Sequence, residues 1–411
     1  ATGNIVEFGT YPQSAVTDSN LITTLSACTL SADNIVVYNG NQYKKILFAQ
    51  YSSISGGFTD NSGYTYQDNN GYYKNTVYWF KCEPIQWRVL SYKNGNLFVF
   101  SEKILDSKAY NPANSAITWE ACGARSWLNN EFYNAAFSAE EKAMIKTTNV
   151  INANNPVSGV TGGNTTADKL FLISYTEAVN TSYGFSAGIA ADTARTAQGT
   201  DFSKCSGLYV NTAMPNINNS YWWLRTPGNS TSEATTANLN GSVLSDINNQ
   251  ACLGIRPVLK MNLQSAAFIP KEDTGFTVDY ENRFIYGLTT GLTSLESYYE
   301  TVNGFLLSYA GVIGTGTRVN ISLGGWVVDH FKTVIFGDVN GDGNIDSLDA
   351  GRMVDNENKV ITWNPTVDAV YLKAGDLNDD GNIDSTDAGI AVDVENGRLT
   401  INQITGLAVP K

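Results

Sequence analysis

Histidine is almost missing from this chain of 411 residues, in which His330 is the single example. A Ser-His-Asp triad, a Cys-His pair and a histidine-rich zinc site are therefore excluded from the whole segment before His330, because each of them needs an imidazole. The chemistry that remains open in that segment uses carboxylates, tyrosines, lysines or thiols.

Long apolar runs and basic clusters are also missing. No stretch reaches the roughly 20 apolar residues that a membrane-spanning helix needs, so we expect no membrane span. The chain has 26 Lys and Arg against 39 Asp and Glu, which gives a formal net charge of −13. A chain without a basic run offers no patch that attracts nucleic acid or anionic lipid. We therefore expect no nucleic-acid partner.

Cysteines are few and widely spaced. There are five, and an odd number leaves at least one thiol without a partner in its own chain. A CxxC pair is absent, which disfavours a zinc knuckle or a redox motif. We expect mostly buried thiols. One or two disulfides are possible, and the sequence does not determine their pairing. The five are Cys28, Cys82, Cys122, Cys205 and Cys252.

What the chain has instead is an acidic loop that occurs twice near its C-terminal end. The segments Asp338–Asp349 and Asp376–Asp387 match position by position, with Gly343 and Gly381 at the sixth place, where a ligand loop turns sharply. A hard cation such as Ca²⁺ takes about six to eight oxygen ligands, and this spacing supplies them. We therefore predict two calcium ions, with the side-chain ligands Asp338, Asn340, Asp342, Asn344, Asp346, Asp349, Asp376, Asn378, Asp380, Asn382, Asp384 and Asp387.

The loops differ from the full EF-hand pattern, because the twelfth position is Asp instead of Glu and we expect no helix before either loop. A helical stretch follows each one, at 350–355 and at 388–393. A loop and a following helix, present twice over residues 337–411, resemble a type I dockerin. The resemblance implies a helical module with two calcium loop-helix repeats that docks a secreted protein to a scaffoldin cohesin, in a free or cell-surface cellulosome. A calcium-stabilised terminal cap without a partner is the alternative.

The dockerin resemblance also implies where a cohesin binds. The near-twofold repeat allows two binding orientations in principle. The halves differ, however, because Leu348 and Met353 of the first half correspond to Thr386 and Ala391 of the second. Carried over by position, the cohesin-binding residues are Ser347, Leu348, Val354, Lys359, Ser385, Thr386, Val392 and Arg398.

Residues 1–270 predict a large α+β module with many short strands and long loops. We expect a hairpin from Pro84–Leu90 and Leu97–Phe100, and a helix over Ser138–Lys146 that begins with a capping box. Five segments resemble an uncharacterised bacterial domain family related in fold to formylglycine-generating enzymes and C-type lectins, which implies a fold and no activity. They are Pro84–Leu90, Thr118–Asn129, Phe171–Ser174, Trp222–Pro227 and Gly254–Leu259.

Aromatic side chains are the candidate ligand-binding groups of this first module. The ligand would be a glycan or a protein; an enzyme that modifies polysaccharide or protein, and a structural adhesin, are the alternatives. Tryptophans in strands and amphipathic helices usually pack in a core, so we interpret Trp87, Trp119, Trp127, Trp222 and Trp223 in that way. We interpret the arginines as ties between loops. The tyrosines expected to be exposed are Tyr64, Tyr66, Tyr72, Tyr73 and Tyr78.

Residues 271–336 are expected to form a small β-rich spacer module. Phe276–Gly287 predicts a hairpin, and Thr293–Glu300 predicts a short helix capped by Thr293. Its last strand runs into the first acidic loop through Gly337 alone, without a Ser- or Pro-rich linker. We therefore expect this spacer to pack on the C-terminal module.

Overall fold

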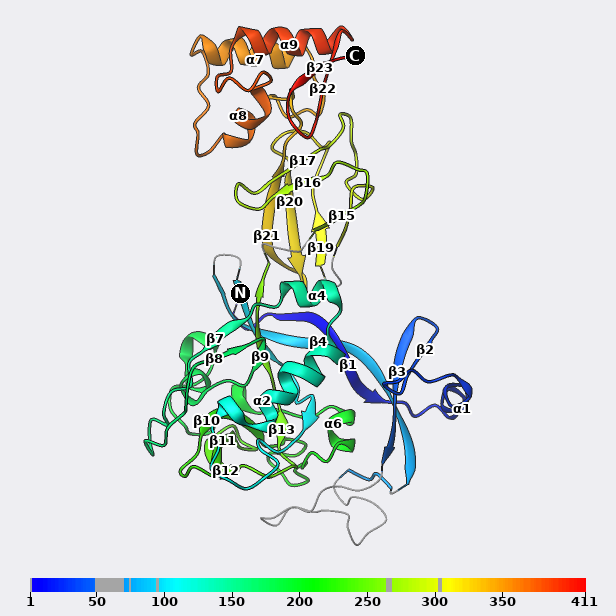
Figure 1. Ribbon diagram of the computed structural model, residues 1–411, viewed down its shortest axis with the longest axis vertical. Helices are drawn as coiled ribbons and strands as arrows, with labels where there is room; N and C mark the ends of the chain where they lie inside the picture. The colour runs from blue at the N-terminus through cyan, green and yellow to red at the C-terminus, as the bar shows by residue number, and fades with distance from the viewer. Residues whose placement is uncertain (1, 49–69, 74, 94–95, 264–267, 302–304) are drawn as a thin grey trace. The chain divides into compact units, whose positions relative to one another are not determined.

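The computed structural model of the chain describes residues 2–48, 70–73, 75–93, 96–263, 268–301 and 305–411. They form two compact units, Ala1–Asn262 and Leu263–Lys411 (Figure 1). Two tyrosines expected at a ligand site, Tyr64 and Tyr66, lie outside the described residues. Within the described part of the chain, no helix has the length and apolar character that crossing a membrane requires.

The first unit is built on a seven-stranded sheet around the long strand β4 (Thr76–Lys93). One half of β4 pairs with β3 and the other half with β5, both antiparallel, and β1 also pairs with β4. The predicted hairpin is confirmed, because Arg88 pairs with Phe100 and Val89 with Val99. The other strands of this sheet are β1 (Ile5–Ala15), β2 (Ile35–Tyr38), β3 (Asn41–Phe48), β5 (Asn96–Ser101), β9 (Leu170–Phe171) and β14 (Val258–Asn262).

A second sheet of the first unit has five strands in the order β12-β11-β10-β13-β6. Its central strand β10 is buried along its whole length, which explains the run of aromatic and aliphatic residues at Trp222–Pro227. Two short strands, β7 (Thr148–Val150) and β8 (Thr166–Asp168), pair separately. The five strands are β6 (Asp106–Ser107), β10 (Trp222–Pro227), β11 (Glu233–Ala237), β12 (Val243–Ile247) and β13 (Gly254–Ile255).

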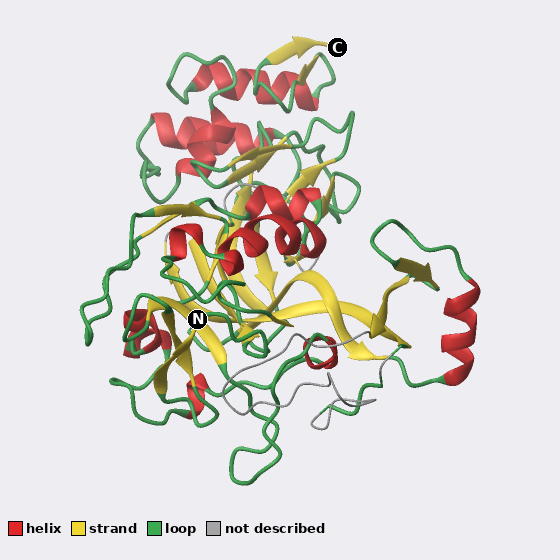
Figure 2. Cartoon of the chain, turned by 60° about the horizontal axis from the view of Figure 1, so that its bottom comes forward, coloured by secondary structure: helices red, strands yellow, loops and turns green. Residues whose placement is uncertain are grey.

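The helices of the first unit are short (Figure 2). The predicted capping box is confirmed at α4: the Ser138 hydroxyl accepts from the Glu141 amide at 3.2 Å, and the Glu141 carboxylate accepts from the Ser138 amide at 2.9 Å. The helical segments are α1 (Ser19–Ala27), η1 (Trp119–Ala121), α2 (Gly123–Trp127), η2 (Leu128–Phe132), α3 (Tyr133–Ala136), α4 (Ala139–Met144), α5 (Tyr175–Ala178), η3 (Thr181–Tyr183), η4 (Thr193–Arg195) and α6 (Asp201–Cys205).

The second unit begins with a five-stranded sheet in the order β16-β17-β21-β20-β19. The predicted hairpin is confirmed, since β16 and β17 pair antiparallel. A separate pair joins β15 (Phe268–Pro270) to β18 (Tyr299–Thr301), so residues 268–270 belong to this unit and not to the N-terminal module, where we expected them. The five strands are β16 (Thr277–Asp279), β17 (Phe284–Tyr286), β19 (Phe305–Ser308), β20 (Arg318–Leu323) and β21 (Trp326–Thr333).

The helix predicted over Thr293–Glu300 is wrong. The segment forms turns that lead into β18, where Tyr299 pairs with Pro270. The neighbours Tyr298 and Tyr299 are both buried, and the Tyr299 ring packs edge-on against Phe268, with 5.6 Å between their centroids. Strand pairing and aromatic packing therefore outweigh the local capping signal, which is worth only about 1 kcal/mol.

The C-terminal part of the second unit has three helices, α7 (Ser347–Glu357), α8 (Ala369–Gly375) and α9 (Ser385–Glu395), and a final pair of strands, β22 (Leu399–Ile401) and β23 (Ala408–Pro410). The helix α8 runs directly into the second acidic loop, which corrects our expectation that no helix precedes either loop.

The spacer and the helices share one hydrophobic core. Phe284, Val334 and Phe336 from the spacer cluster with residues of the helical part that include Met353 and Ile401. In addition, the Gln403 carboxamide donates to the Phe336 carbonyl at 2.8 Å and accepts from its amide at 2.8 Å. The parts that we expected as a spacer and a helical module therefore pack as one unit.

Candidate metal-binding loops

The first acidic loop is organised around the carboxylate of Asp338, which is fully buried. Its Oδ1 accepts from the Gly341 amide at 2.6 Å, and its Oδ2 accepts from the Gly343 amide at 3.0 Å. The Oδ2 atom also accepts from the amide of Thr315, at 2.8 Å, and Thr315 lies in the spacer. The first residue of the loop is therefore fixed both by its own loop and by the spacer.

The far end of the first loop is a helix start. Asp346 and Asp349 form a capping box at the beginning of α7, and the Asp349 carboxylate accepts from the Asp346 amide at 3.0 Å. The same carboxylate accepts from the amides of Val339 and Asn340, at 2.9 and 3.0 Å. One side chain therefore joins the two ends of the loop and caps the helix that follows.

The second loop repeats this arrangement. Asp376 accepts from the Gly381 amide at 3.0 Å, and Asp387 accepts from the amides of Leu377 and Asp384, at 2.8 and 3.0 Å. Asp384 and Asp387 form the capping box of α9. In both loops the glycine at the sixth place has the expected left-handed backbone, with φ of 87° at Gly343 and 85° at Gly381.

Burial makes the negative charges of these loops unfavourable. It raises the pKa of Asp349 to about 6, and the Asp338 carboxylate acts in the same direction, against backbone donors that lower it. It likewise raises the pKa of Asp338 and of Asp387. Carboxylates that face one another away from water are stabilised by a bound cation, which is the role that Ca²⁺ has in a loop of oxygen ligands.

The donor set fits calcium by its chemistry. Within the described residues, no three His, Cys, Asp or Glu side chains form a group that could hold a metal ion, so the carboxylates of a loop do not make up the ligand set by themselves. Asparagine oxygens complete each loop: Asn340 Oδ1 accepts from the Asp342 amide at 2.8 Å, and Asn378 Oδ1 from the Asp380 amide at 3.0 Å. An all-oxygen set with amides and carboxylates suits a hard cation and not a thiolate- or imidazole-binding metal.

The residues expected to contact a cohesin lie on α7, on α9 and just after each helix. Ser347, Ser385 and Thr386 are exposed, and the Leu348 side chain is 65% exposed. In each repeat the pair at the helix start lies between the two residues of a capping box. Of the others, Lys359 and Arg398 are exposed and Val354 and Val392 are half-buried.

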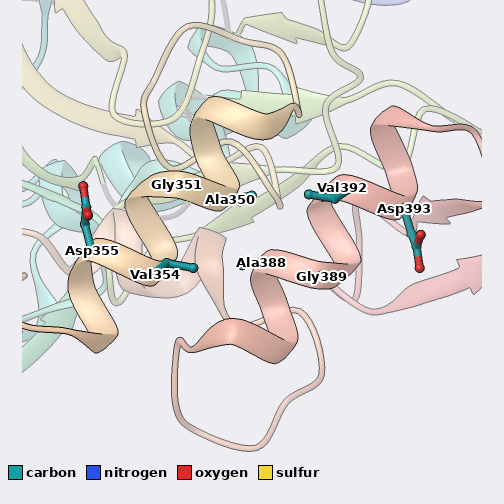
Figure 3. Close-up of a pocket in the computed structure, with 8 residues that line it drawn as sticks. All are labelled: Ala350, Gly351, Val354, Asp355, Ala388, Gly389, Val392 and Asp393. Atoms are coloured by element: carbon teal, nitrogen blue, oxygen red, sulfur yellow. The ribbon is translucent and has the colours of Figure 1, made fainter.

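A shallow groove separates α7 from α9 (Figure 3). Val354 and Val392 point into it from the two helices, and Asp355 and Asp393 lie toward its two ends. The small residues Ala350, Gly351, Ala388 and Gly389 also line it. The groove therefore has nearly the same composition from either helix.

The spacer residues at the first loop were missed by sequence reasoning. An added Cβ at Gly314 would lie 2.2 Å from the Gly341 carbonyl oxygen, and the amide of Gly291 donates to the Gly343 carbonyl at 3.0 Å. The one signal available was the glycine-rich segment around Gly314 and Gly316, which has no obvious role in a strand.

Four of the five tryptophans interpreted as core residues are in the core, since Trp87, Trp119, Trp222 and Trp223 are each 0% exposed. The fifth, Trp127, is only half-buried. Among the tyrosines expected to be exposed, Tyr73 is 55% exposed, Tyr72 is buried and Tyr78 is half-buried. The arginines connect segments, as interpreted: for example, Arg125 Nε donates a hydrogen bond to Asp168 Oδ1 at 2.6 Å.

Comparison with known protein families gives two matches. Residues 94–263 match a domain of unknown function (DUF6273), and residues 336–391 match the dockerin type I domain. No curated protein and no solved structure matches the chain. The chain therefore carries a type I dockerin domain, and such domains bind calcium through their loop-helix repeats.

Proposed function

We propose that this chain is a secreted cellulosome component that docks to a scaffoldin cohesin through two calcium-bound loop-helix repeats. A type I dockerin supports docking of this kind. The observation that carries the finer proposal is the position of the cohesin-contact pairs. Ser347 and Leu348 lie between Asp346 and Asp349, which are at once predicted calcium ligands and the capping box of α7.

In this proposal, the position of the contact pairs makes docking depend on calcium. The second repeat has the same order, with Ser385 and Thr386 between the capping residues Asp384 and Asp387. Calcium bound by these carboxylates keeps them ionised and fixes the loop, and the fixed loop fixes the first turn of the helix. The contact pair is then held in one orientation before the cohesin arrives, which lowers the ordering cost of binding.

Two variants and their combination test this binding face. Leu348→Asp and Thr386→Asp each place a charge on one half. We expect each single variant to bind a type I cohesin in calorimetry, because the other half remains, and the double variant to lose binding. Val367→Asp is the matched control, since Val367 is 66% exposed and lies between α7 and α8, outside the contact set. Native affinity of the double variant would rule out this face.

For the N-terminal domain we propose binding of a glycan or protein ligand, on a fold like that of C-type lectins. Support comes from aromatic groups that reach the surface: Tyr73, and Trp127 with the Lys108 ammonium 4.6 Å above its ring. The alternative is an enzyme that modifies polysaccharide or protein, for which no residue is assigned. Retention on a glycan array without turnover favours binding, and product release from a polysaccharide panel favours the enzyme.

A further inference from the structure

The two calcium loops are nearly identical in sequence but have different surroundings. Asp338 is fully buried, whereas Asp376 at the same position of the second loop is half-buried. Gly343 is buried and Gly381 is exposed. An added Cβ at Gly381 would meet nothing within 4 Å, whereas one at Gly343 would lie 2.7 Å from the Ile313 carbonyl oxygen. The difference is that a segment of the spacer covers the first loop.

The covering segment is residues 312–316, which we call the strap. It is fixed to the spacer: the Thr315 hydroxyl donates to the Ile335 carbonyl and accepts from the Ile335 amide, both at 3.0 Å, and the Gly316 amide donates to the Thr333 carbonyl at 2.8 Å. At Gly314 the strap lies so close to the backbone of Gly341 that only glycine fits. These bonds and this close packing hold the strap in one position relative to the first loop.

The strap also reaches the ligand carboxylate itself. Thr315 donates its amide to the same Asp338 oxygen that accepts from Gly343, and Thr315 is 2% exposed. In the second loop, the hydrogen bonds that Asp376 accepts come from its own loop, from Asp380 and Gly381. A hydrogen bond to a buried charged group is among the stronger ones in a protein, so the extra donor holds the first carboxylate more firmly.

We propose that the strap makes the two calcium sites unequal, so that the first loop holds its ion tightly and releases it slowly while the second exchanges freely. This inference rests on calcium occupying both loops, as in the proposed function. Release from the first loop requires the strap to move away from Asp338 and Gly343, which breaks bonds into β21 and the residues after it. Release from the second loop requires no such movement. The first ion therefore stays bound for longer and links the spacer to α7. The second ion is the one whose occupancy follows the calcium concentration.

Stopped-flow release from the full chain tests this inference. The calcium-loaded protein is mixed with a fluorescent chelator after its content has been measured as two ions per chain. We expect two phases of equal amplitude that differ by at least about tenfold in rate, since one hydrogen bond to a charged group contributes about that factor. Asp376→Ala should remove the fast phase and Asp338→Ala the slow one. A content below two ions would count against the proposed calcium sites themselves, and is thereby distinguished from a failure of the strap.

A glycine variant distinguishes the effect of the strap on calcium release from the effect of the loop itself. Gly314→Ala should accelerate the slow phase by about tenfold and leave the fast phase unchanged, because the added methyl group displaces the strap from Gly341. Gly351→Ala is the control, since an added Cβ there meets nothing within 4 Å. A single phase in the native protein, or a slow phase that disappears in Asp376→Ala, would overturn the inference, and neither result depends on how well Gly314→Ala folds.

Discussion

The amide of Thr315 donates a hydrogen bond of 2.8 Å to the carboxylate of Asp338. This bond joins a spacer residue to the first residue of a calcium loop, and both residues are buried. A loop that would otherwise stand open at the start of a dockerin is thus completed by the sequence that precedes it.

Removal of calcium should destabilise the second unit and leave the first unchanged. All predicted ligands lie in Leu263–Lys411. At calcium about 1,000-fold above the dissociation constant, each ion contributes about 4 kcal/mol, which corresponds to a melting temperature roughly 10 °C higher per ion and roughly 20 °C higher for both in a unit of this size. Differential scanning calorimetry with calcium and with EDTA measures the change. The thermal transition whose midpoint changes in the Asp376→Ala variant is that of the second unit. Identical scans with calcium and with EDTA would contradict the prediction.

The two loop glycines should differ in their tolerance of alanine. Both have left-handed backbones, so alanine costs about 1 kcal/mol at either place. Only Gly343 faces the strap, with the Ile313 carbonyl 2.7 Å from the added Cβ, so Gly343→Ala should lose clearly more stability than Gly381→Ala. Denaturant unfolding in saturating calcium compares them. Equal losses would mean that the strap does not restrain the first loop.

The thiols should be free and mostly unreactive. All five cysteines are unpaired in the structure and three of them are buried, so the expectation of mostly buried thiols is confirmed and the disulfides that the sequence left possible are not formed. Burial raises the pKa of Cys122, Cys205 and Cys252 to about 12, and at pH 8 they stay protonated, whereas the reactive form is the thiolate. A colorimetric thiol reagent should count five thiols in denaturant and at most the two partly exposed ones, Cys28 and Cys82, in the native protein. Fewer than five in denaturant would reveal a disulfide.

Asp168 should be a structural residue of the first unit. It is 0% exposed and accepts from Trp119 Nε1 at 2.9 Å, Thr166 Oγ1 at 2.7 Å and Arg125 Nε at 2.6 Å. Asp168→Ala leaves these donors without an acceptor and should cost about 3–5 kcal/mol in the free energy of unfolding. The exposed Glu131→Ala is the control. Calcium content should be unchanged in both variants, and a loss below about 1 kcal/mol would show that the network is dispensable.

Short sequence patterns correctly predicted those elements whose contacts join residues close together in the chain. The capping box at Ser138 and the hairpins at β4-β5 and β16-β17 were readable from residue type and spacing, because caps and turns are set by neighbours in sequence. The two acidic loops and the helices after them were readable because the same residue pattern occurs twice, and because the capping box that starts each helix joins residues close together in sequence.

Contacts between distant segments could not be read in this way. Thr315 of the strap contacts Asp338, 23 residues further along the chain, and no residue pattern in the strap indicates that contact. The helix expected over Thr293–Glu300 failed because Tyr299 pairs with Pro270. The direct connection through Gly337 did predict that the spacer and the helices pack together, because two parts joined without a flexible linker lie next to each other.

Calcium-dependent docking is tested most directly by calorimetric titration of the full chain with a type I cohesin, first with calcium and then with EDTA. Tight binding with calcium and none with EDTA is the predicted result, because the contact pairs lie between ligands that calcium fixes. Binding of equal strength in EDTA would contradict the coupling of calcium to the contact face. Absence of binding in a protein that holds both ions would contradict the docking role itself.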